Sequence, residues 1–173
     1  MIIKDQNLLR NKCENATQEE LPSIIQKLEV ELGEANKFEI TGIGLAAPQI
    51  GINKRVAIIR IGTFSFDIVN CSIETGYDMV ESKEGCLSVP GKTCIVKRYN
   101  EIVVKNNELG NPKQFVAFGL PAICLQHEMD HWDGILMLDK AIPQHINIGD
   151  NEKCYCGSGN KYKKCCKQKQ PII

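Results

Sequence analysis

The feature that most limits the folds open to this chain is the segment Gln126-His-Glu-Met-Asp-His131. Its histidines, His127 and His131, are four residues apart, so on an α-helix both imidazoles project from nearly the same face. Two imidazoles in this arrangement can bind one metal ion, and Glu128 beside the first of them can take a proton from water. Two histidines at this spacing can also be ordinary core or surface residues. With three histidines in the whole chain, a metal-binding helix is the better interpretation.

The rest of the sequence predicts an α+β fold. A capping pattern at Thr17 and Glu20 precedes apolar residues at helical spacing, and Gly33 permits that helix to end. The apolar positions are Leu21, Ile24, Ile25, Leu28 and Leu32. Short runs, most of them rich in β-branched residues, predict strands at 55–61, 65–69, 94–96, 101–105 and 114–118. Because no helix separates these runs, we expect antiparallel strands surrounding a central metal-binding helix that begins near Gly119 and ends near Asp133.

An HExxH helix needs a third protein ligand to hold a catalytic metal. The downstream glutamate that many peptidases use is hard to find, since Glu152 is the only glutamate after His131. Upstream, Cys86 follows a glycine and precedes a Pro-Gly turn, which would present a thiolate toward the helix. Three protein ligands leave the fourth position open for water, as catalytic sites do. Taken alone, however, Cys86 is better interpreted as a buried, unreactive cysteine.

Three segments together change that interpretation, because they resemble the signature motifs of peptide deformylases in order and spacing. They are Gly-Ile-Gly-Leu-Ala-Ala-Pro-Gln at 42–49, Glu-Gly-Cys-Leu-Ser at 84–88 and Gln-His-Glu-Met-Asp-His at 126–131. The resemblance covers residues 1–142. It implies a metal-dependent hydrolase that removes the N-formyl group from the N-terminal methionine of newly made polypeptides and releases formate.

The resemblance also implies roles for single residues. Glu128 matches the general acid and base of the family, and Gln49 and the backbone amide of Leu87 match the groups that stabilise an oxyanion. The catalytic metal ligands implied are Cys86, His127 and His131. The family typically uses iron(II), and nickel, cobalt and zinc can occupy the same ligands.

Substrate contacts follow from the same resemblance. Because glycine lets another backbone approach closely, we expect the substrate to lie as an added strand along residues 42–44. The expected substrate-binding residues are Ile43, Gly44, Leu120, Ile123 and Cys124, although each of the four with a side chain can equally be ordinary core. Glu84 matches a position that orients the site, and Arg98 one that is internal and salt-bridged. Trp132 and Thr93 depart from the family pattern.

The C-terminal residues have a different composition. Residues 143–153, His145 included, lack apolar periodicity and are predicted to be a linker. Residues 154–173 resemble the SEC-C motif, which implies a structural zinc site too small to fold without its metal. The four zinc ligands implied are Cys154, Cys156, Cys165 and Cys166. Five lysines make this tail basic, so we expect it to dock on the ribosome or on an acidic protein surface.

Charge and cysteine content restrict the setting of the protein. The formal net charge is zero, which excludes a general electrostatic attraction to nucleic acid. No apolar run approaches membrane-spanning length, and the N-terminus does not resemble a signal peptide. Nine cysteines, an odd number, then favour reduced thiols and a cytoplasmic protein without a membrane partner.

Two other functions compete with deformylation. An HExxH zinc peptidase would need a third ligand downstream of His131, where the sequence offers little. An inactive deformylase fold could instead be a platform for the zinc tail, with partner binding as its function. Intact Cys86, Gln49 and Glu128 argue against this, because a chain without catalysis would have no chemical need for all three.

Overall fold

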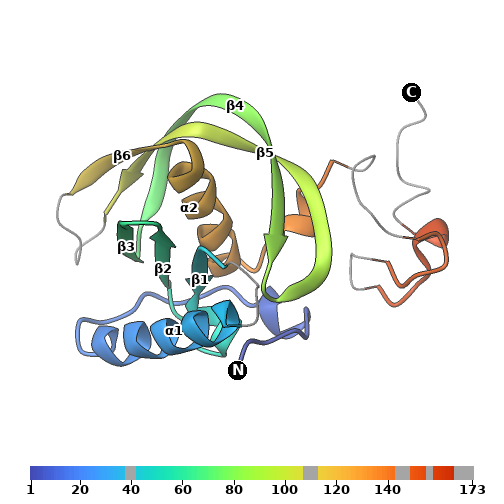
Figure 1. The fold of residues 1–173 in the computed structure, drawn as a ribbon, viewed down its shortest axis with the longest axis horizontal. Coiled ribbons are helices and arrows are strands. Elements are labelled where there is room, and N and C mark those ends of the chain that lie inside the picture. Colours follow the sequence, from blue (N-terminus) through green and yellow to red (C-terminus); the bar gives the residue numbers. More distant parts are fainter. Residues whose placement is uncertain (38–41, 107–112, 143–148, 155–157, 166–173) are drawn as a thin grey trace.

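The computed structural model describes residues 1–37, 42–106, 113–142, 149–154 and 158–165. The chain has an α+β fold, as expected, and these residues form two α-helices and two antiparallel sheets (Figure 1). Its main elements are α1 (Leu21–Asn36), β1 (Gly44–Ala46), β2 (Val56–Ile61), β3 (Phe64–Val69), β4 (Ser72–Cys86), β5 (Val89–Lys105), β6 (Gln114–Phe118) and α2 (Gly119–Trp132). Short 3-10 helices occupy Leu8–Arg10, Ala47–Ile50, Met137–Asp139 and Tyr162–Lys164.

The two sheets are arranged so that α2 lies between them. One has the strand order β1-β2-β3 and the other β4-β5-β6, and every pair of neighbouring strands is antiparallel. The predicted antiparallel pairing is therefore confirmed. The main core joins apolar side chains of both sheets to α2, through Leu125, Met129 and Trp132. Helix α2, the expected metal-binding helix, is thus buried at the centre of the molecule.

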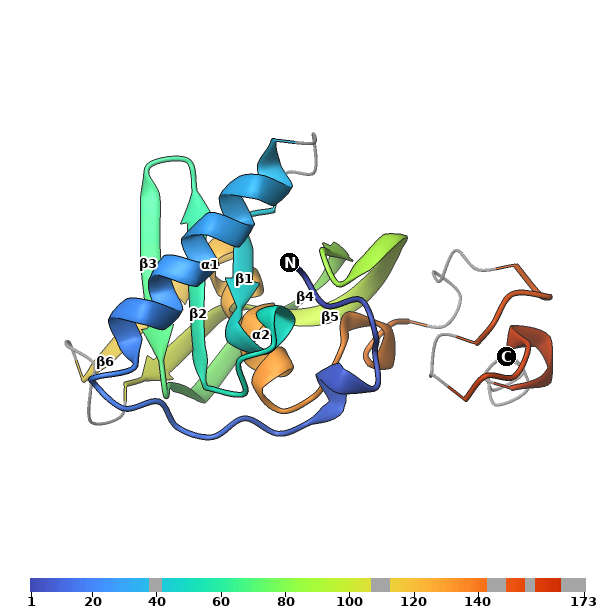
Figure 2. The same ribbon diagram turned by 90° about the horizontal axis from the view of Figure 1, so that it is seen from below.

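The continuous apolar run at residues 56–59 is explained by the position of β2 between two helices. Its side chains alternate between two buried faces, because α2 covers one face of the β1-β2-β3 sheet and α1 covers the other (Figure 2). Ala57 and Ile59 pack in the core around α2, whereas Val56 and Ile58 pack against α1.

None of the helices in the described part of the chain combines the length and apolarity needed to cross a bilayer.

Several boundaries differ from those predicted. Helix α1 begins at Leu21, and Thr17 keeps half of a capping box, since its N–H donates to Glu20 Oε2 (2.8 Å). The helix continues past Gly33 to Asn36, because an exposed helical glycine costs only about 1 kcal/mol. The segments 94–96 and 101–105 belong to one strand, β5, whose polar middle includes Arg98.

Strand β4 was not predicted. Most of its side chains are exposed, so the segment lacks an alternating apolar pattern. Asp78 also has a positive φ, which interrupts the regular extended backbone. The strand forms nevertheless because it pairs along nearly its whole length with β5. Long-range pairing of this kind leaves little trace in local composition.

Gln126 extends the sheet beyond the end of β6. Strand β6 pairs with β5 no further than Glu101, and the Gln126 side chain takes its place beside Tyr99. Its Oε1 accepts from the Tyr99 N–H (2.9 Å), and its Nε2 donates to the carbonyls of Tyr99 (2.7 Å) and Ala122 (3.0 Å). A buried amide therefore attaches α2 to β5.

Replacing Gln126 with leucine is expected to lower the free energy of unfolding by about 2–4 kcal/mol, because both Tyr99 backbone groups lose their partner. Urea denaturation would measure the change. Gln26→Leu, at an exposed position of α1, is the matched control and should change stability by less than about 0.5 kcal/mol. Equal effects at the two glutamines would contradict this account.

Candidate metal centre and substrate pocket

The structure brings together the three side chains expected to bind the catalytic metal. His127 and His131 project from one face of α2, and Cys86 is the last residue of β4. Their ligand atoms all lie within 4.8 Å of one another. The Cys86 Sγ and the His131 Nε2 are 3.4 Å apart. One thiolate and two imidazoles this close form a donor set suited to a single transition-metal ion.

A buried ionic network orients the first histidine. Its Nδ1 donates to Glu84 Oε2 (2.8 Å), so its Nε2 is the nitrogen on the side of Cys86, where a metal would bind. Glu84 in turn accepts two hydrogen bonds from Arg98 (2.8 and 3.0 Å), and Arg98 also donates to Asp130 (2.5 Å). Arg98 is 1% exposed and Glu84 is 7% exposed, in keeping with the internal, site-orienting positions that the resemblance implied.

The charged side chains of this network stabilise one another in their ionised forms. Burial alone would raise the pKa of Glu84, but hydrogen bonds from His127 and Arg98 outweigh it and lower the pKa to about 2. Burial likewise opposes the charge of Arg98, whereas hydrogen bonds to Glu84 and its attraction to Asp130 raise its pKa. Glu84 therefore stays ionised at neutral pH and remains an acceptor for the imidazole.

The surroundings of the candidate ligands favour a cation. Burial lowers the pKa of His127, but its hydrogen bonds to Cys86 and Glu84 and the nearby Glu128 raise it well above its ordinary value. The same groups would favour a divalent ion. For His131, burial and the charge of His127 lower the pKa, so this imidazole is neutral and its lone pair is available. The residues therefore fit a bound metal.

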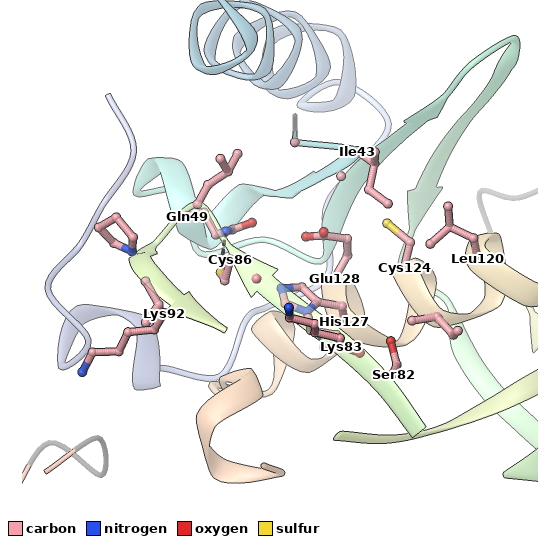
Figure 3. A pocket seen from close by; sticks show the side chains of 18 of the residues that line it. Ile43, Gln49, Ser82, Lys83, Cys86, Lys92, Leu120, Cys124, His127 and Glu128 are labelled. Carbon is pink, nitrogen blue, oxygen red and sulfur yellow. Dashed lines mark hydrogen bonds and ion pairs between the residues drawn. The ribbon is translucent and has the colours of Figure 1, made fainter. Parts of the chain in front are cut away.

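Glu128 directs its carboxylate into the space that Cys86 and His127 border (Figure 3). It is buried, and within the described residues its Oε2 has no hydrogen-bond partner. Burial raises the pKa of Glu128 to about 7, although the charge of His127 acts in the opposite direction. A carboxyl group with a pKa near neutrality can both accept and donate a proton at working pH.

Gln49 is fixed on the opposite side of the same space (Figure 3). Its Oε1 accepts from the Ala46 N–H (2.8 Å), and its Nε2 donates to Ser88 Oγ (3.2 Å) and Cys86 Sγ (3.4 Å). The amide N–H group is therefore aimed at the candidate metal site. Leu87 also lines this space. Ser88 was not singled out from the sequence, although its place inside the Glu-Gly-Cys-Leu-Ser motif was a usable signal.

The pocket in front of these residues has a volume of about 560 Å³, within the range of ligand sites. All of the expected substrate-binding residues line it: Ile43, Gly44, Leu120, Ile123 and Cys124. Their packing differs, because Cys124 also belongs to the main core whereas Leu120 is 50% exposed. Thr93 is exposed and is not among the residues that line the pocket.

Two edge strands face the pocket from opposite sides. Strand β4 is the first strand of its sheet, and its residues 82–86 line the pocket together with Leu87. Residues 42–44, which lead into the edge strand β1, line the other side. Unpaired strand edges are the surfaces to which an extended peptide adds as a further strand.

Gly44 is the position where this wall most needs a glycine. A Cβ there would lie 2.5 Å from Glu128 Oε1 and 2.8 Å from Cys124 Sγ. We expect Gly44→Ala to displace the Glu128 carboxylate and to lower kcat/KM by about 100-fold for the formyl-methionyl peptide that the family resemblance implies as substrate. Formate release would measure this. Gly33→Ala, where a Cβ would meet nothing within 4 Å, should leave turnover unchanged; a similar loss in both variants would contradict the prediction.

Trp132 is accommodated behind the helix. It is fully buried, its Nε1 donates to the Val56 carbonyl (3.2 Å), and the Arg55 guanidinium lies 5.1 Å from its ring centroid. The indole N–H of Trp132 therefore has a hydrogen-bond partner, and its ring has a cation–π contact. Next to Trp132, the ligand atom of His131 still lies within 4.8 Å of those of Cys86 and His127.

Half of the expected zinc ligands in the tail can be placed. Cys154 is buried, and its N–H donates to the Asn160 carbonyl (2.6 Å). Cys165 is partly buried, with its Sγ 3.2 Å from Ser158 Oγ. Cys156 and Cys166 lie outside the described residues, as does His145. The four-cysteine zinc site and the linker at 143–153 therefore stay predictions.

Antiparallel sheets around an HExxH helix, with a cysteine from an adjacent strand at the histidines, define a class of metal-dependent hydrolases. Comparison with known families narrows this class. Residues 1–147 match the family model of polypeptide deformylase, and residues 151–168 match that of the SEC-C motif. The chain belongs to the polypeptide deformylase family.

Individual relatives agree with this assignment. A peptide deformylase of Caldicellulosiruptor bescii is 45% identical over 106 residues, which are 61% of this chain and 64% of that protein, so the match spans slightly less than two thirds of the relative. The actinonin complex of a Synechococcus elongatus peptide deformylase has 35% identity and a TM-score of 0.72, covering 82% of this chain and 77% of the other. A class I type b peptide deformylase from Acinetobacter baumannii with bound Met-Ala-Ser has 31% identity and a TM-score of 0.68, covering 81% and 96%.

Proposed function

We propose that the chain is an active, metal-dependent peptide deformylase that hydrolyses the N-formyl group of formyl-methionyl polypeptides. The observation that carries this proposal is the convergence of Cys86, His127 and His131 with the buried carboxylate of Glu128 in one pocket. Membership of the family supplies the reaction. The products are formate and a free α-amino group.

Cys86, His127 and His131 would hold the catalytic ion, and iron(II) is the ion we propose, as is typical of the family. A divalent ion held there lowers the pKa of water so that hydroxide is available near neutral pH. Glu84 fixes the ring of His127 through its Nδ1, so that its Nε2 faces the other two ligands.

Glu128 moves the protons of the reaction. Its carboxylate accepts the proton that water loses as oxygen attacks the formyl carbon, and it then protonates the departing amine. The carbon–nitrogen bond breaks, and no net proton is lost or gained by Glu128. Burial, which raises the pKa of this group to about 7, matches it to both halves of the cycle.

Gln49 and the backbone N–H of Leu87 stabilise the negative oxygen that forms on the formyl carbon. The Gln49 amide is held in advance by Ala46 and Ser88, so little reorganisation is needed as charge develops. The formyl-methionyl chain lies as an added strand between β4 and residues 42–44. Its methionine side chain enters the apolar part of the pocket at Ile43, Leu120, Ile123 and Cys124.

The direct test is formate release from a formyl-methionyl tripeptide by protein loaded anaerobically with iron(II). Turnover that is lost on chelation and restored by iron(II) would establish the activity. Reconstitution with nickel, cobalt and zinc in parallel would rank the metals. Failure with all four ions would refute deformylation and favour the platform function.

For the tail, we propose that Cys154, Cys156, Cys165 and Cys166 hold a structural zinc ion and that the motif docks on the ribosome. The SEC-C match and the buried Cys154 support the first statement. The exposed lysines Lys161, Lys163 and Lys164 support the second. Such an enzyme would work in the cytoplasm, where formylated chains emerge.

Zinc content and ribosome co-sedimentation test the two statements separately. Cys154→Ser should remove about one equivalent of zinc and leave iron binding unchanged. Removal of residues 143–173 should reduce co-sedimentation, with the loss becoming smaller as salt is raised. Unchanged co-sedimentation of the shortened chain would refute docking, and an acidic protein partner would then be sought.

A further inference from the structure

The mouth of the pocket carries positive charge that the proposed chemistry does not use. Seven lining residues are ionisable, and five of them belong to the candidate metal centre, its support or the substrate pocket: Glu84, Cys86, Cys124, His127 and Glu128. The other two are Lys83 and Lys92, both on the β4–β5 hairpin (Figure 3). Lys83 is exposed and Lys92 is half-buried.

Neither lysine forms an ion pair with a described residue of this chain. In the strand register, Lys83 lies opposite Ile95, an apolar residue. The nearest acidic residue on the exposed face of β4 is Glu81, which lies directly opposite Lys97. Glu81 is therefore placed to offset the charge of Lys97, and the charge at the pocket mouth is left uncompensated within the described residues.

The alternation of β4 decides which substrate side chain meets this charge. Glu84 is buried on the inner face of β4 and Cys86 shares that face, whereas Lys83 and Gly85 are exposed on the outer face. A peptide that adds to the free edge of β4 has the same alternation. If its methionine side chain points inward to the apolar pocket, the side chain of the next residue points outward, on the face of Lys83.

We infer that Lys83 forms a subsite for an acidic side chain, aspartate or glutamate, at the residue that follows formyl-methionine. Lys92 is not part of it, because Lys92 precedes Thr93, the partner of the outward-facing Gly85, and therefore lies on the other face of the hairpin. This inference rests on the proposed function. Gly85 adds room for such a side chain, because the nearest atoms to a Cβ placed there are 3.9 Å away. Opposite charges facing each other across neighbouring strands are expected to favour the acidic substrate roughly two- to five-fold.

The test compares formyl-Met-Asp-Ala with formyl-Met-Asn-Ala, which differ in charge and hardly in size. The wild-type ratio of kcat/KM should favour aspartate, and raised salt should reduce it. Lys83→Gln should lower the ratio and bring it close to one. Lys105→Gln, on the far end of β5, is the matched control and should keep the wild-type ratio.

Binding of the deformylated peptides Met-Asp-Ala and Met-Asn-Ala, measured by calorimetry, separates this inference from the proposed function. A wild-type enzyme that turns over both formyl peptides equally, or a preference that survives in Lys83→Gln, would overturn the subsite and leave deformylation standing. If no formyl peptide is turned over, the proposed function fails. The calorimetric ratio then decides the subsite alone: a lysine-dependent preference for aspartate supports it, and equal affinities refute it.

Discussion

Glu128→Gln is expected to lower kcat/KM for a formyl-methionyl peptide by about 10²–10⁴-fold, the range associated with loss of a general acid and base. Glutamine has nearly the same shape as glutamate, so the packing around this buried side chain should persist. The amide can neither accept the proton of the attacking water nor protonate the departing amine. Formate release by the iron-loaded variant would measure the loss.

Two controls make the result specific. Metal content of the Glu128→Gln protein should equal that of the wild type, because the expected ligands are Cys86, His127 and His131. Glu81→Gln, which neutralises an exposed carboxylate on β4, should retain full turnover of an uncharged tripeptide. If Glu128→Gln kept a tenth or more of the wild-type kcat/KM with metal bound, proton transfer would have to be assigned to another group.

Arg98→Met is expected to lower the free energy of unfolding by about 3–5 kcal/mol, the usual cost of removing one partner of a buried ion pair. The guanidinium is almost fully buried and bonds to two carboxylates, those of Glu84 and Asp130. Methionine has a similar volume but no charge, so Glu84 would be left in the interior with His127 as its remaining partner. Urea denaturation of the metal-free protein would measure the change.

Arg60→Met is the matched control, because Arg60 also bonds to two carboxylates, those of Glu29 and Asp67, but at the surface. Exposed ion pairs contribute about 1 kcal/mol or less, so this variant should lose far less stability. Adding Glu84→Gln to Arg98→Met should recover part of the lost stability by removing the uncompensated charge. It should also weaken metal binding by about 10- to 100-fold, since His127 loses its carboxylate partner. Equal losses in the two arginine variants would show that the buried network contributes no more to stability than surface ion pairs do.

The sequence predicted the parts of this fold that have a local signature. Helix α2 and its ligand spacing, the apolar run of β2 and the antiparallel pairing could all be inferred, because spacing and composition reflect local geometry. Strand β4 could not be inferred, since it owes its form to pairing with β5 and leaves most of its side chains in solvent.

For the candidate site, the functional residues were easier to infer than the contacts that hold them in position. The ligand set and Glu128 came from the motifs, whereas Cys86 would not have been chosen without the family resemblance. The bond between Glu84 and His127 joins residues 43 apart in the sequence, and no local pattern reports a contact of that kind. The role of Gln126 in attaching α2 to β5 and the lysines at the pocket mouth likewise emerged only from the arrangement of β4, β5 and α2.

The attachment of α2 through Glu84, Arg98 and Asp130 has a consequence for how the enzyme acquires its ion. His127 and Asp130 lie on neighbouring strips of the helix surface, and each is held by a bond to the β4–β5 hairpin. Turning the helix about its own axis in either direction would stretch one of these bonds. The angular setting of α2 is therefore fixed by bonds within the protein that need no ion. The ion should then bind to a preorganised site, and its on-rate should be limited by dehydration of the ion rather than by ordering of the chain.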